Sequence, residues 1–325
     1  YSIVVFSIHN YLYINEEIGE DNSIELLSFI AKLFASLLSD DECYGFLGDG
    51  SFAMLINNVS PHSVRDRIYL VERVSRRNDI LLSRKIKLAF DVGVYNIFEN
   101  RNRTVYQMIE CASTAAEHNS DKSGQLFSVY TEEISQDIAR NERIELMMEN
   151  ALDNRDFRVF VQPKYNVSAD KIDSVEALVR WFDPTRGEYM FPGEFIPLFE
   201  TNGFITKLDH FVYTEVLEFI SKAAEHGDKV VPVAVNVSRV TAGNEDFLNF
   251  YIGNKKKYRI PDGFITIEFT ESFAMEDYDK IAHVIEELHK NGIRCSIDDF
   301  GSGYSSFNIL KRIHVDELKL DAVFA

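Results

Sequence analysis

Five apolar, β-branched segments in this chain each carry a polar side chain close to their carboxyl end, and this feature constrains the fold most. The segments are SVEALVRW, VPVAVNVS, FITIEFTE, IRCSIDDF and HVDELKLD. They alternate with helical patterns, which predicts a mostly parallel sheet with helices outside, closed or open. An unpaired carboxylate inside such a sheet costs several kcal/mol or takes up a proton. We therefore expect the strand ends to converge on a shared polar site.

Each of the polar strand ends also fits an ordinary structural role. The residues are Glu176, Asn236, Glu268, Asp298, Asp299 and Lys319. Glu176 with Arg180 fits an ion pair, Asn236 fits a helix cap, and Lys319 fits a surface lysine. Their coincidence at the same ends of five strands favours a divalent cation instead. Oxygen ligands without Cys or His suit Mg²⁺ or Mn²⁺, and adjacent aspartates allow one carboxylate to bridge two ions.

The hydrophobic periodicity predicts two domains joined by a helical connector. Residues 1–130 follow the order of a ferredoxin-like α+β domain, with strands near 1–8, 44–56, 85–95 and 125–130 and helices near 24–38, 61–80 and 104–118. Residues 131–154 contain no Gly or Pro and are expected to be helical. In 155–325 six strands are expected, near 157–163, 172–182, 230–237, 264–269, 293–298 and 315–320, with helices such as 207–226 and 276–291 between them. Polar strand ends match the site position of (β/α) barrels, and six strands fall short of eight.

The composition disfavours two classes of binding partner. The net charge of −18 and the pI of about 4.9 disfavour nucleic acid and anionic membranes. Three cysteines, far apart and odd in number, predict reduced thiols and a cytoplasmic location. The chain begins without Met and stops just after a strand, so we expect a fragment whose parent has an upstream sensory or membrane region.

Several sequence blocks follow one another in order between residues 140 and 325. They are FVQPKY, EALVRW at 176–181, FIPLFE, NVS, EFTES, DDFGSGYSS and LKLD. Together they resemble the EAL family of cyclic di-GMP phosphodiesterases, whose signature is the EAL of the second block. The resemblance implies a TIM-like (β/α)₈-type barrel whose first strand runs antiparallel to the others. It also implies hydrolysis of cyclic di-GMP to linear pGpG with two Mg²⁺ or Mn²⁺ ions.

The resemblance also assigns roles to individual residues. The implied metal ligands are Glu176, Asn236, Glu268, Asp298 and Asp299. Lys319 resembles the lysine that positions or helps deprotonate the attacking water, so the implied catalytic set is Glu176, Asp299 and Lys319. Gln162 and Arg180 resemble ligand contacts, and Glu271 resembles the glutamate that braces the loop 299–306. A further glutamate and a glutamine of the family fall after residue 325, so we expect this chain alone to be weak or inactive.

The hairpin in residues 1–130 reads Gly48, Asp49, Gly50, Ser51 and Phe52. With the element order of this region, it resembles a degenerate form of the GGDEF family of diguanylate cyclases. Aligned on Phe52, the two acidic positions carry Gly50 and Ser51. Ser7 replaces a metal-binding Asp and Leu12 a lysine, while Asn15 is retained. Without carboxylates to hold Mg²⁺ on a triphosphate, we expect no cyclase activity. A structural or dimerising remnant and a regulatory GTP pocket both remain open.

The leading hypothesis is therefore a cyclic di-GMP phosphodiesterase with an inactive GGDEF-like regulatory domain. The alternatives are a receptor that binds cyclic di-GMP without cutting it, and a protein-interaction module in bacterial second-messenger signalling. The resemblance also implies a homodimer that pairs near the loop 299–306.

Overall fold

The computed structural model describes residues 1–57, 61–75, 78–98, 102–120, 126–270, 273, 278–301 and 313–320. By contacts the chain divides into two compact units, Tyr1–Arg140 and Asn141–Ala325. The predicted domain boundaries at residues 130 and 154 stay a prediction. Among the described helices, none combines the length and apolar character that crossing a membrane requires.

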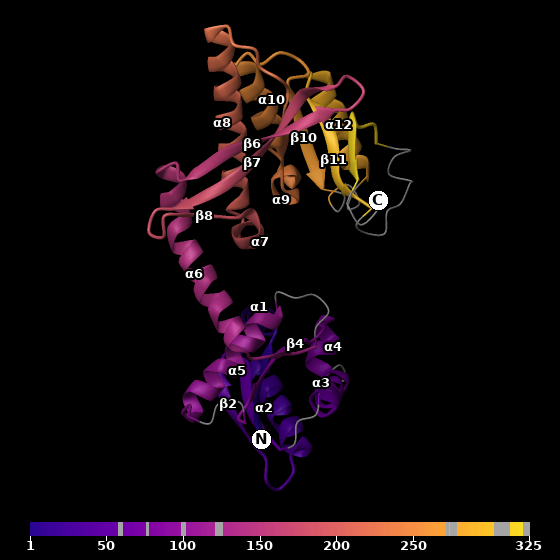
Figure 1. Cartoon of the computed structure of the whole chain (residues 1–325). Helices are drawn as coiled ribbons and strands as arrows, with labels where there is room; N and C mark the ends of the chain where they lie inside the picture. The colour runs from indigo at the N-terminus through magenta and orange to yellow at the C-terminus, as the bar shows by residue number, and fades with distance from the viewer. Residues whose placement is uncertain are drawn as a thin grey trace. The chain divides into compact units, whose positions relative to one another are not determined.

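The first unit is built on a five-stranded sheet in the order β2-β3-β1-β4-β5 (Figure 1). Its described strands are β1 (Ser2–Ile8), β2 (Cys43–Gly48), β3 (Ser51–Ile56), β4 (Phe90–Asn96) and β5 (Ser128–Val129). The central strand β1 pairs antiparallel with both β3 and β4, and β5 pairs parallel with β4. This mixed sheet with helices confirms the predicted α+β class.

Alternating side chains of β1 pack into two hydrophobic cores, one on each face of the sheet. Val4 and Phe6 pack with Phe34 and Phe52 on one face, whereas Ile3 and Val5 lie in the other core. The helices of this unit are α1 (Tyr11–Ile18), α2 (Glu20–Leu37), α3 (Pro61–Ser75), α4 (Asp79–Arg84) and α5 (Val105–Ser120).

The predicted single helix over 61–80 is wrong, because the structure has two helices there. α3 ends at Ser75 and α4 begins at Asp79. The Asn78 side chain caps α4 by accepting from the backbone N–H groups of Ile80 at 3.0 Å and Leu81 at 3.4 Å. α4 then continues to Arg84, so the strand predicted from residue 85 begins only at Phe90.

The predicted helical connector contains one long helix, α6 (Glu132–Asp153). In the second unit its Arg143 binds Asp183 at 2.7 Å, and its Asn150 carbonyl accepts from the Asn154 N–H at 2.9 Å.

The second unit contains a seven-stranded sheet that curls into a half-barrel. The strand order is β12-β11-β10-β9-β7-β6, with β8 paired to β7. The described strands are β6 (Phe157–Asn166), β7 (Lys171–Asp183), β8 (Glu188–Met190), β9 (Val233–Asn236), β10 (Ile265–Thr270), β11 (Arg294–Phe300) and β12 (Glu317–Leu320). β6 runs antiparallel to β7, and β7, β9, β10, β11 and β12 run parallel. The first strand is thus antiparallel, as expected.

Helices cover the outer face of this sheet in Figure 1. They are α7 (Pro192–Asn202), α8 (Ile205–His226), α9 (Arg239–Gly243), α10 (Phe247–Lys257) and α12 (Tyr278–Lys290). Trp181 on β7 is fully buried against Phe195 and Phe199 of α7. This aromatic core fixes β7, and with it the strand face that carries Glu176.

Candidate metal centre in the half-barrel

The ammonium group of Lys319 lies at the centre of three carboxylates. Its Nζ donates to Glu176 Oε2 at 3.0 Å, to Glu268 Oε2 at 2.9 Å and to Asp298 Oδ2 at 2.7 Å. Asn236 adds an amide to this group, because its Nδ2 donates to Glu176 Oε1 at 2.8 Å. The structure therefore brings together five of the residues predicted from the strand ends.

The register of the parallel strands explains why these side chains meet. Asn236 on β9 pairs with Glu268 on β10, and Asp298 on β11 pairs with Thr270, two residues beyond Glu268. Side chains two residues apart point to the same face of a strand, and neighbouring strands lie about 4.8 Å apart. One face of the sheet consequently presents Glu176, Asn236, Glu268 and Asp298 side by side.

At Glu268, burial and the neighbouring positive charges shift the pKa in opposite directions. Its side chain is fully buried. Burial raises the pKa of Glu268 above its ordinary value, while hydrogen bonds from Lys164 and Lys319 act to lower it. Desolvation alone would lower the pKa of Lys319, but its hydrogen bonds to Asp298, Glu268 and Glu176 hold that pKa above the ordinary range. The three carboxylates therefore share the positive charge of Lys319, and Lys164 adds a second positive charge at Glu268.

The donor set fits a divalent cation. One carboxylate oxygen from each of Glu176, Glu268 and Asp298 lies within 4.8 Å of the others, and Asn236 lies beside them. Hard oxygen donors of this kind suit Mg²⁺ or Mn²⁺. The Lys319 ammonium already shows that a cation is accommodated among them. Glu176, Asn236, Glu268 and Asp298 are the residues that would hold an ion.

Asp299 lies beside the cluster in a left-handed backbone conformation, with φ at 54°. Its backbone N–H donates to Asp298 Oδ1 at 2.8 Å, so it fixes the orientation of the Asp298 carboxylate. The Asp299 side chain is exposed and is not one of the three grouped carboxylates of the described chain. Its predicted role toward a second ion stays a prediction. Glu271, the predicted loop-bracing residue, lies outside the described residues, as does most of the loop 299–306.

The two predicted ligand contacts lie on the face of the sheet that carries Glu176. Gln162 on β6 is exposed and stands directly opposite Glu176 in the β6–β7 register. Arg180 lies four residues further along β7, donates to the Val179 carbonyl at 2.7 Å and stacks over Phe191 at 5.7 Å. Glu176 pairs with Lys319 and Asn236, and among described contacts it forms no ion pair with Arg180.

Sequence reasoning missed two charged residues of the site, Lys164 and Glu317. Lys164 Nζ donates to Glu268 Oε1 at 2.7 Å and to Glu317 Oε1 at 3.0 Å. Lys164 follows Gln162 by two residues and so shares its face, and it lies in the block FVQPKY. The two-residue spacing from Gln162 is the sequence signal that could have identified Lys164 as a site residue.

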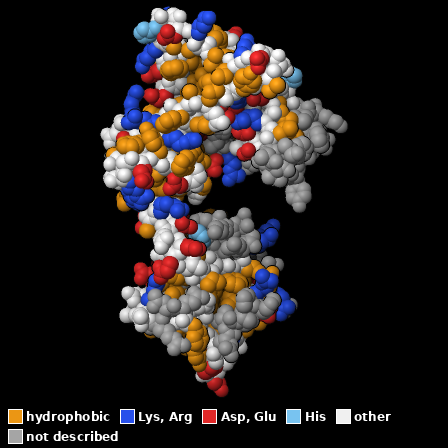
Figure 2. All heavy atoms as spheres, viewed as in Figure 1, with side chains coloured by type: hydrophobic (Ala, Val, Ile, Leu, Met, Phe, Trp, Pro, Cys, Tyr) orange, Lys and Arg blue, Asp and Glu red, His pale blue; other side chains and the backbone are white. Residues whose placement is uncertain are grey.

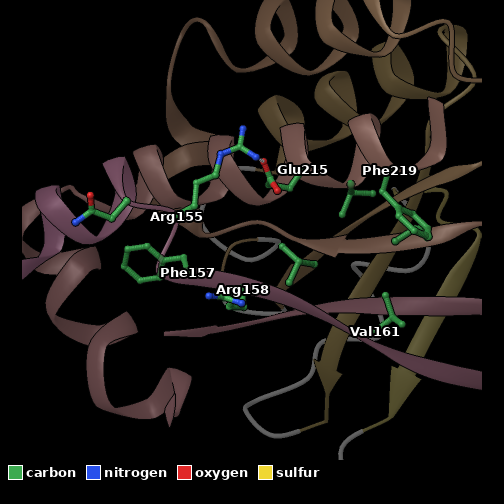
Figure 3. A pocket seen from close by; sticks show the side chains of 10 residues that line it. Arg155, Phe157, Arg158, Val161, Glu215 and Phe219 are labelled. Atoms are coloured by element: carbon green, nitrogen blue, oxygen red, sulfur yellow. Dashed lines mark ion pairs between the residues drawn. The ribbon is translucent and has the colours of Figure 1, made fainter. Parts of the chain in front are cut away.

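A cavity of about 560 Å³ lies between β6 and α8, away from the acidic cluster (Figure 3). Val159, Val161 and Phe219 line it, and Arg155 pairs with Glu215 at its side at 3.2 Å. Val161 and Gln162 are consecutive residues of one strand and point to opposite faces. The cavity therefore belongs to the outer face of β6. Figure 2 shows hydrophobic side chains exposed on one face of this unit. The exposed large apolar residues of β6 and β7 are Phe160, Val161, Tyr165 and Ile172.

In the first unit the hairpin predicted at 48–52 is confirmed, and its turn carries no paired carboxylates. Asp49 and Gly50 both have positive φ, at 45° and 74°. Ser51 Oγ donates to Ser7 Oγ at 2.9 Å, so two hydroxyls meet at the expected acidic positions. A Cβ atom on Gly50 would lie 2.5 Å from the ring of Tyr11, which packs against the turn.

The remaining residues of this degenerate site give no further support for a nucleotide pocket. Asn15 lies in α1, partly exposed, and Leu12 is largely exposed. Phe52 is buried in the core below the hairpin.

A half-barrel of mostly parallel strands, with three carboxylates grouped on one face, defines a barrel-type domain with an oxygen cluster that could hold a cation. Residues 145–325 match the family model of the EAL domain, and residues 1–125 match that of the diguanylate cyclase GGDEF domain. The chain therefore belongs to the EAL-domain family, with a GGDEF domain in front. EAL domains are metal-dependent, in accord with the acidic cluster.

Curated relatives match nearly the whole length of this chain. The chain is 26% identical over its whole length to the bifunctional diguanylate cyclase/cyclic di-GMP phosphodiesterase MucR of Pseudomonas aeruginosa, covering 47% of that protein. It is 26% identical over 99% of its length to the cyclic di-GMP phosphodiesterase PdeR of Escherichia coli, covering 48% of it. The chain thus spans about half the length of these relatives.

Solved structures confirm the fold. The PaMucR phosphodiesterase in complex with c-di-GMP matches 56% of this chain and 73% of its own, with a TM-score of 0.53 and 32% identity. The GGDEF-EAL part of Vibrio cholerae LapD bound to c-di-GMP matches 99% of this chain with a TM-score of 0.52. At 15% identity the second match shows the fold alone.

Proposed function

We propose that the protein hydrolyses cyclic di-GMP to linear pGpG at the cluster around Lys319. The observation that carries this proposal is the convergence of Glu176, Glu268 and Asp298 on one cation-binding centre inside the EAL domain. The relatives named phosphodiesterases support the reaction, and the c-di-GMP complex of PaMucR supports the ligand.

In this proposal each site residue has a role in the reaction that follows from its chemistry. Two Mg²⁺ or Mn²⁺ ions, when bound, would activate water and absorb the negative charge that develops on the phosphoryl oxygens. Arg180 supplies a planar cation that suits a phosphate oxygen, and Gln162 supplies an amide on the same face. Lys319 contacts all three carboxylates and, in this proposal, orients the attacking water.

The GGDEF domain serves as a regulatory or dimerising module in this proposal and makes no cyclic di-GMP. Ser7 and Ser51 hydrogen-bond to each other at the positions where a cyclase needs carboxylates. Hydroxyls without a carboxylate give Mg²⁺ on a triphosphate little support. GTP binding at this domain and homodimer formation stay proposals, as does the expectation that this chain alone turns over poorly.

The test uses the intact protein with cyclic di-GMP and Mg²⁺ or Mn²⁺, followed by chromatographic separation of pGpG. We expect product from the wild type and a loss of at least about 100-fold in rate for Glu176→Ala, since it removes a ligand carboxylate. Leu146→Ala, a change at an exposed position on α6, serves as the control. Equal rates for wild type and Glu176→Ala would exclude this site.

The alternative function is a cyclic di-GMP receptor without turnover. It would need only the ligand contacts, and Gln162 and Arg180 lie on the face of the sheet that carries Glu176. In the same experiment a receptor would retain bound cyclic di-GMP and release no pGpG.

A further inference from the structure

The two oxygens of the buried Glu268 carboxylate are each bound by a different lysine. Oε2 accepts from Lys319 at 2.9 Å, and Oε1 accepts from Lys164 at 2.7 Å. The side chain is fully buried, so neither oxygen is satisfied by bulk water. The two lysines therefore fix both the position and the charge of this carboxylate.

Lys164 joins the two edges of the described sheet. It comes from β6 at one end of the strand order, and its second partner, Glu317, comes from β12 at the other end. Glu268 lies on β10 between them. The two ion pairs of Lys164, with Glu317 and with Glu268, thus cross the inner face of the half-barrel. Lys164 and Glu317 are 153 residues apart in the sequence.

The two lysines differ in what they contact. Lys319 binds all three carboxylates of the proposed metal centre, so a divalent ion at that centre must displace its ammonium group. Lys164 binds Glu268 on the far oxygen, and its other described ion pair is with Glu317, outside the cluster. A cation can therefore enter beside Glu268 Oε2 while Lys164 keeps its place.

We infer that Lys164 is a positioning residue that holds Glu268 ready as a metal ligand, and that Glu317 holds Lys164 in turn. This inference depends on the proposed function only in that the cluster binds a divalent ion. Its physical basis is the cost of a buried carboxylate without a counter-charge. Once Lys319 moves away, Lys164 is the cation that keeps the outer oxygen of Glu268 bonded.

The experiment is a Mn²⁺ titration of the intact protein, followed by electron paramagnetic resonance of free Mn²⁺. Removing a residue that orients a metal ligand typically weakens metal affinity about 10–100-fold. We expect that loss for Lys164→Met, a smaller loss for Glu317→Gln, and recovery toward wild type for Lys164→Arg. Lys222→Met, at an exposed lysine paired with Glu218 on α8, is the matched control and should bind as the wild type does.

The outcomes separate the inference from the proposed function. If the wild type binds no Mn²⁺, the metal centre and the proposed hydrolysis fail together. If the wild type binds and Lys164→Met binds equally or more tightly, the inference is overturned while the proposed function stands. If Lys164→Met does not fold, Glu317→Gln decides, because its half-exposed side chain permits folding, and unchanged affinity there would overturn the inference.

Discussion

At the scale of single residues, the ammonium group of Lys319 occupies the position of a cation among three acids. Removing it leaves Glu176, Glu268 and Asp298 facing one another with less positive charge between them. Breaking a largely buried ion pair costs on the order of 3 kcal/mol. Removing Lys319 should therefore change both the stability of the fold and the effect of a bound metal ion.

Lys319→Met should lower the melting temperature of the metal-free protein, and added Mn²⁺ should raise it more than in the wild type. The reason is that an ion binding to the folded state then replaces the missing charge. Differential scanning calorimetry with EDTA and with Mn²⁺ measures both shifts. Equal Mn²⁺ shifts in the two proteins would contradict the view that Lys319 and the ion compete for one place.

Asp209 on α8 is buried beside β9, the strand that carries the proposed ligand Asn236. Burial raises the pKa of Asp209 to about 6, although the Ser238 N–H donates to its carboxylate at 3.0 Å. The carboxyl is thus more easily protonated in the folded state than in the unfolded state. Its stabilising contribution is complete below pH 3.9 and is lost as the pH rises through about 6, which amounts to about 3 kcal/mol.

Asp209→Asn, which stays neutral, should therefore lack this fall in the free energy of unfolding between pH 4 and pH 7. Urea unfolding of both proteins at several pH values measures it. The difference between variant and wild type should change by about 3 kcal/mol across that range. Two parallel pH profiles would show that Asp209 does not titrate there.

The sequence predicts the site residues that share a repeated pattern and misses those that depend on cross-sheet contacts. Asn236, Glu268 and Asp298 lie within the last three residues of their strands, whereas Glu176, expected near a strand end, lies in the middle of the long strand β7. All four point to one face, so strand period and parallel order suffice to group them. Lys164 and Glu317 meet because the sheet curls and brings its edge strands together. No local pattern in the chain encodes that curvature.

At the scale of elements, the contact between β4 and α5 is closest at Gly93. A Cβ atom there would lie 2.0 Å from the Ala112 carbonyl oxygen and 2.3 Å from the Ala116 nitrogen. Both neighbours are backbone atoms, so the helix itself must move to accommodate a methyl group. This packing makes glycine necessary at a position that strand propensity alone would fill differently.

Gly93→Ala should therefore lower the free energy of unfolding by about 3 kcal/mol or more. Gly45→Ala on β2 is the matched control, because a Cβ atom there meets nothing within 4 Å, and its expected change is under about 1 kcal/mol. Urea denaturation followed by circular dichroism measures both. Similar losses for the two variants would refute the packing argument.

Most elements could be predicted from periodicity, but not every boundary between them. The strands at 1–8 and 172–182 have strong alternation or strong apolar character, and their predicted bounds lie within one residue of the observed ones. The prediction of one helix over 61–80 fails because the cap at Asn78 starts a second helix after α3, and helical periodicity does not distinguish one helix from two.

At the scale of the whole molecule, one domain carries the acidic cluster and the other carries serine hydroxyls at positions where a cyclase has carboxylates. In the described part of the GGDEF domain the hydroxyls of Ser7 and Ser51 pair with each other. We therefore expect the intact protein, supplied with GTP and Mg²⁺, to form no cyclic di-GMP. Chromatography of the reaction mixture checks this, preferably in Glu176→Ala so that any product persists. Accumulation of cyclic di-GMP would contradict it.

The central claim is that Glu176, Glu268 and Asp298, which all bond to Lys319, form a divalent cation site. The most direct measurement is a crystal structure of the intact protein with Mn²⁺, read from the anomalous scattering of the metal. We predict an anomalous peak bonded to these carboxylates, with the Lys319 ammonium displaced from their centre. A Mn²⁺-saturated crystal with Lys319 still bound to all three acids and no peak among them would contradict the account.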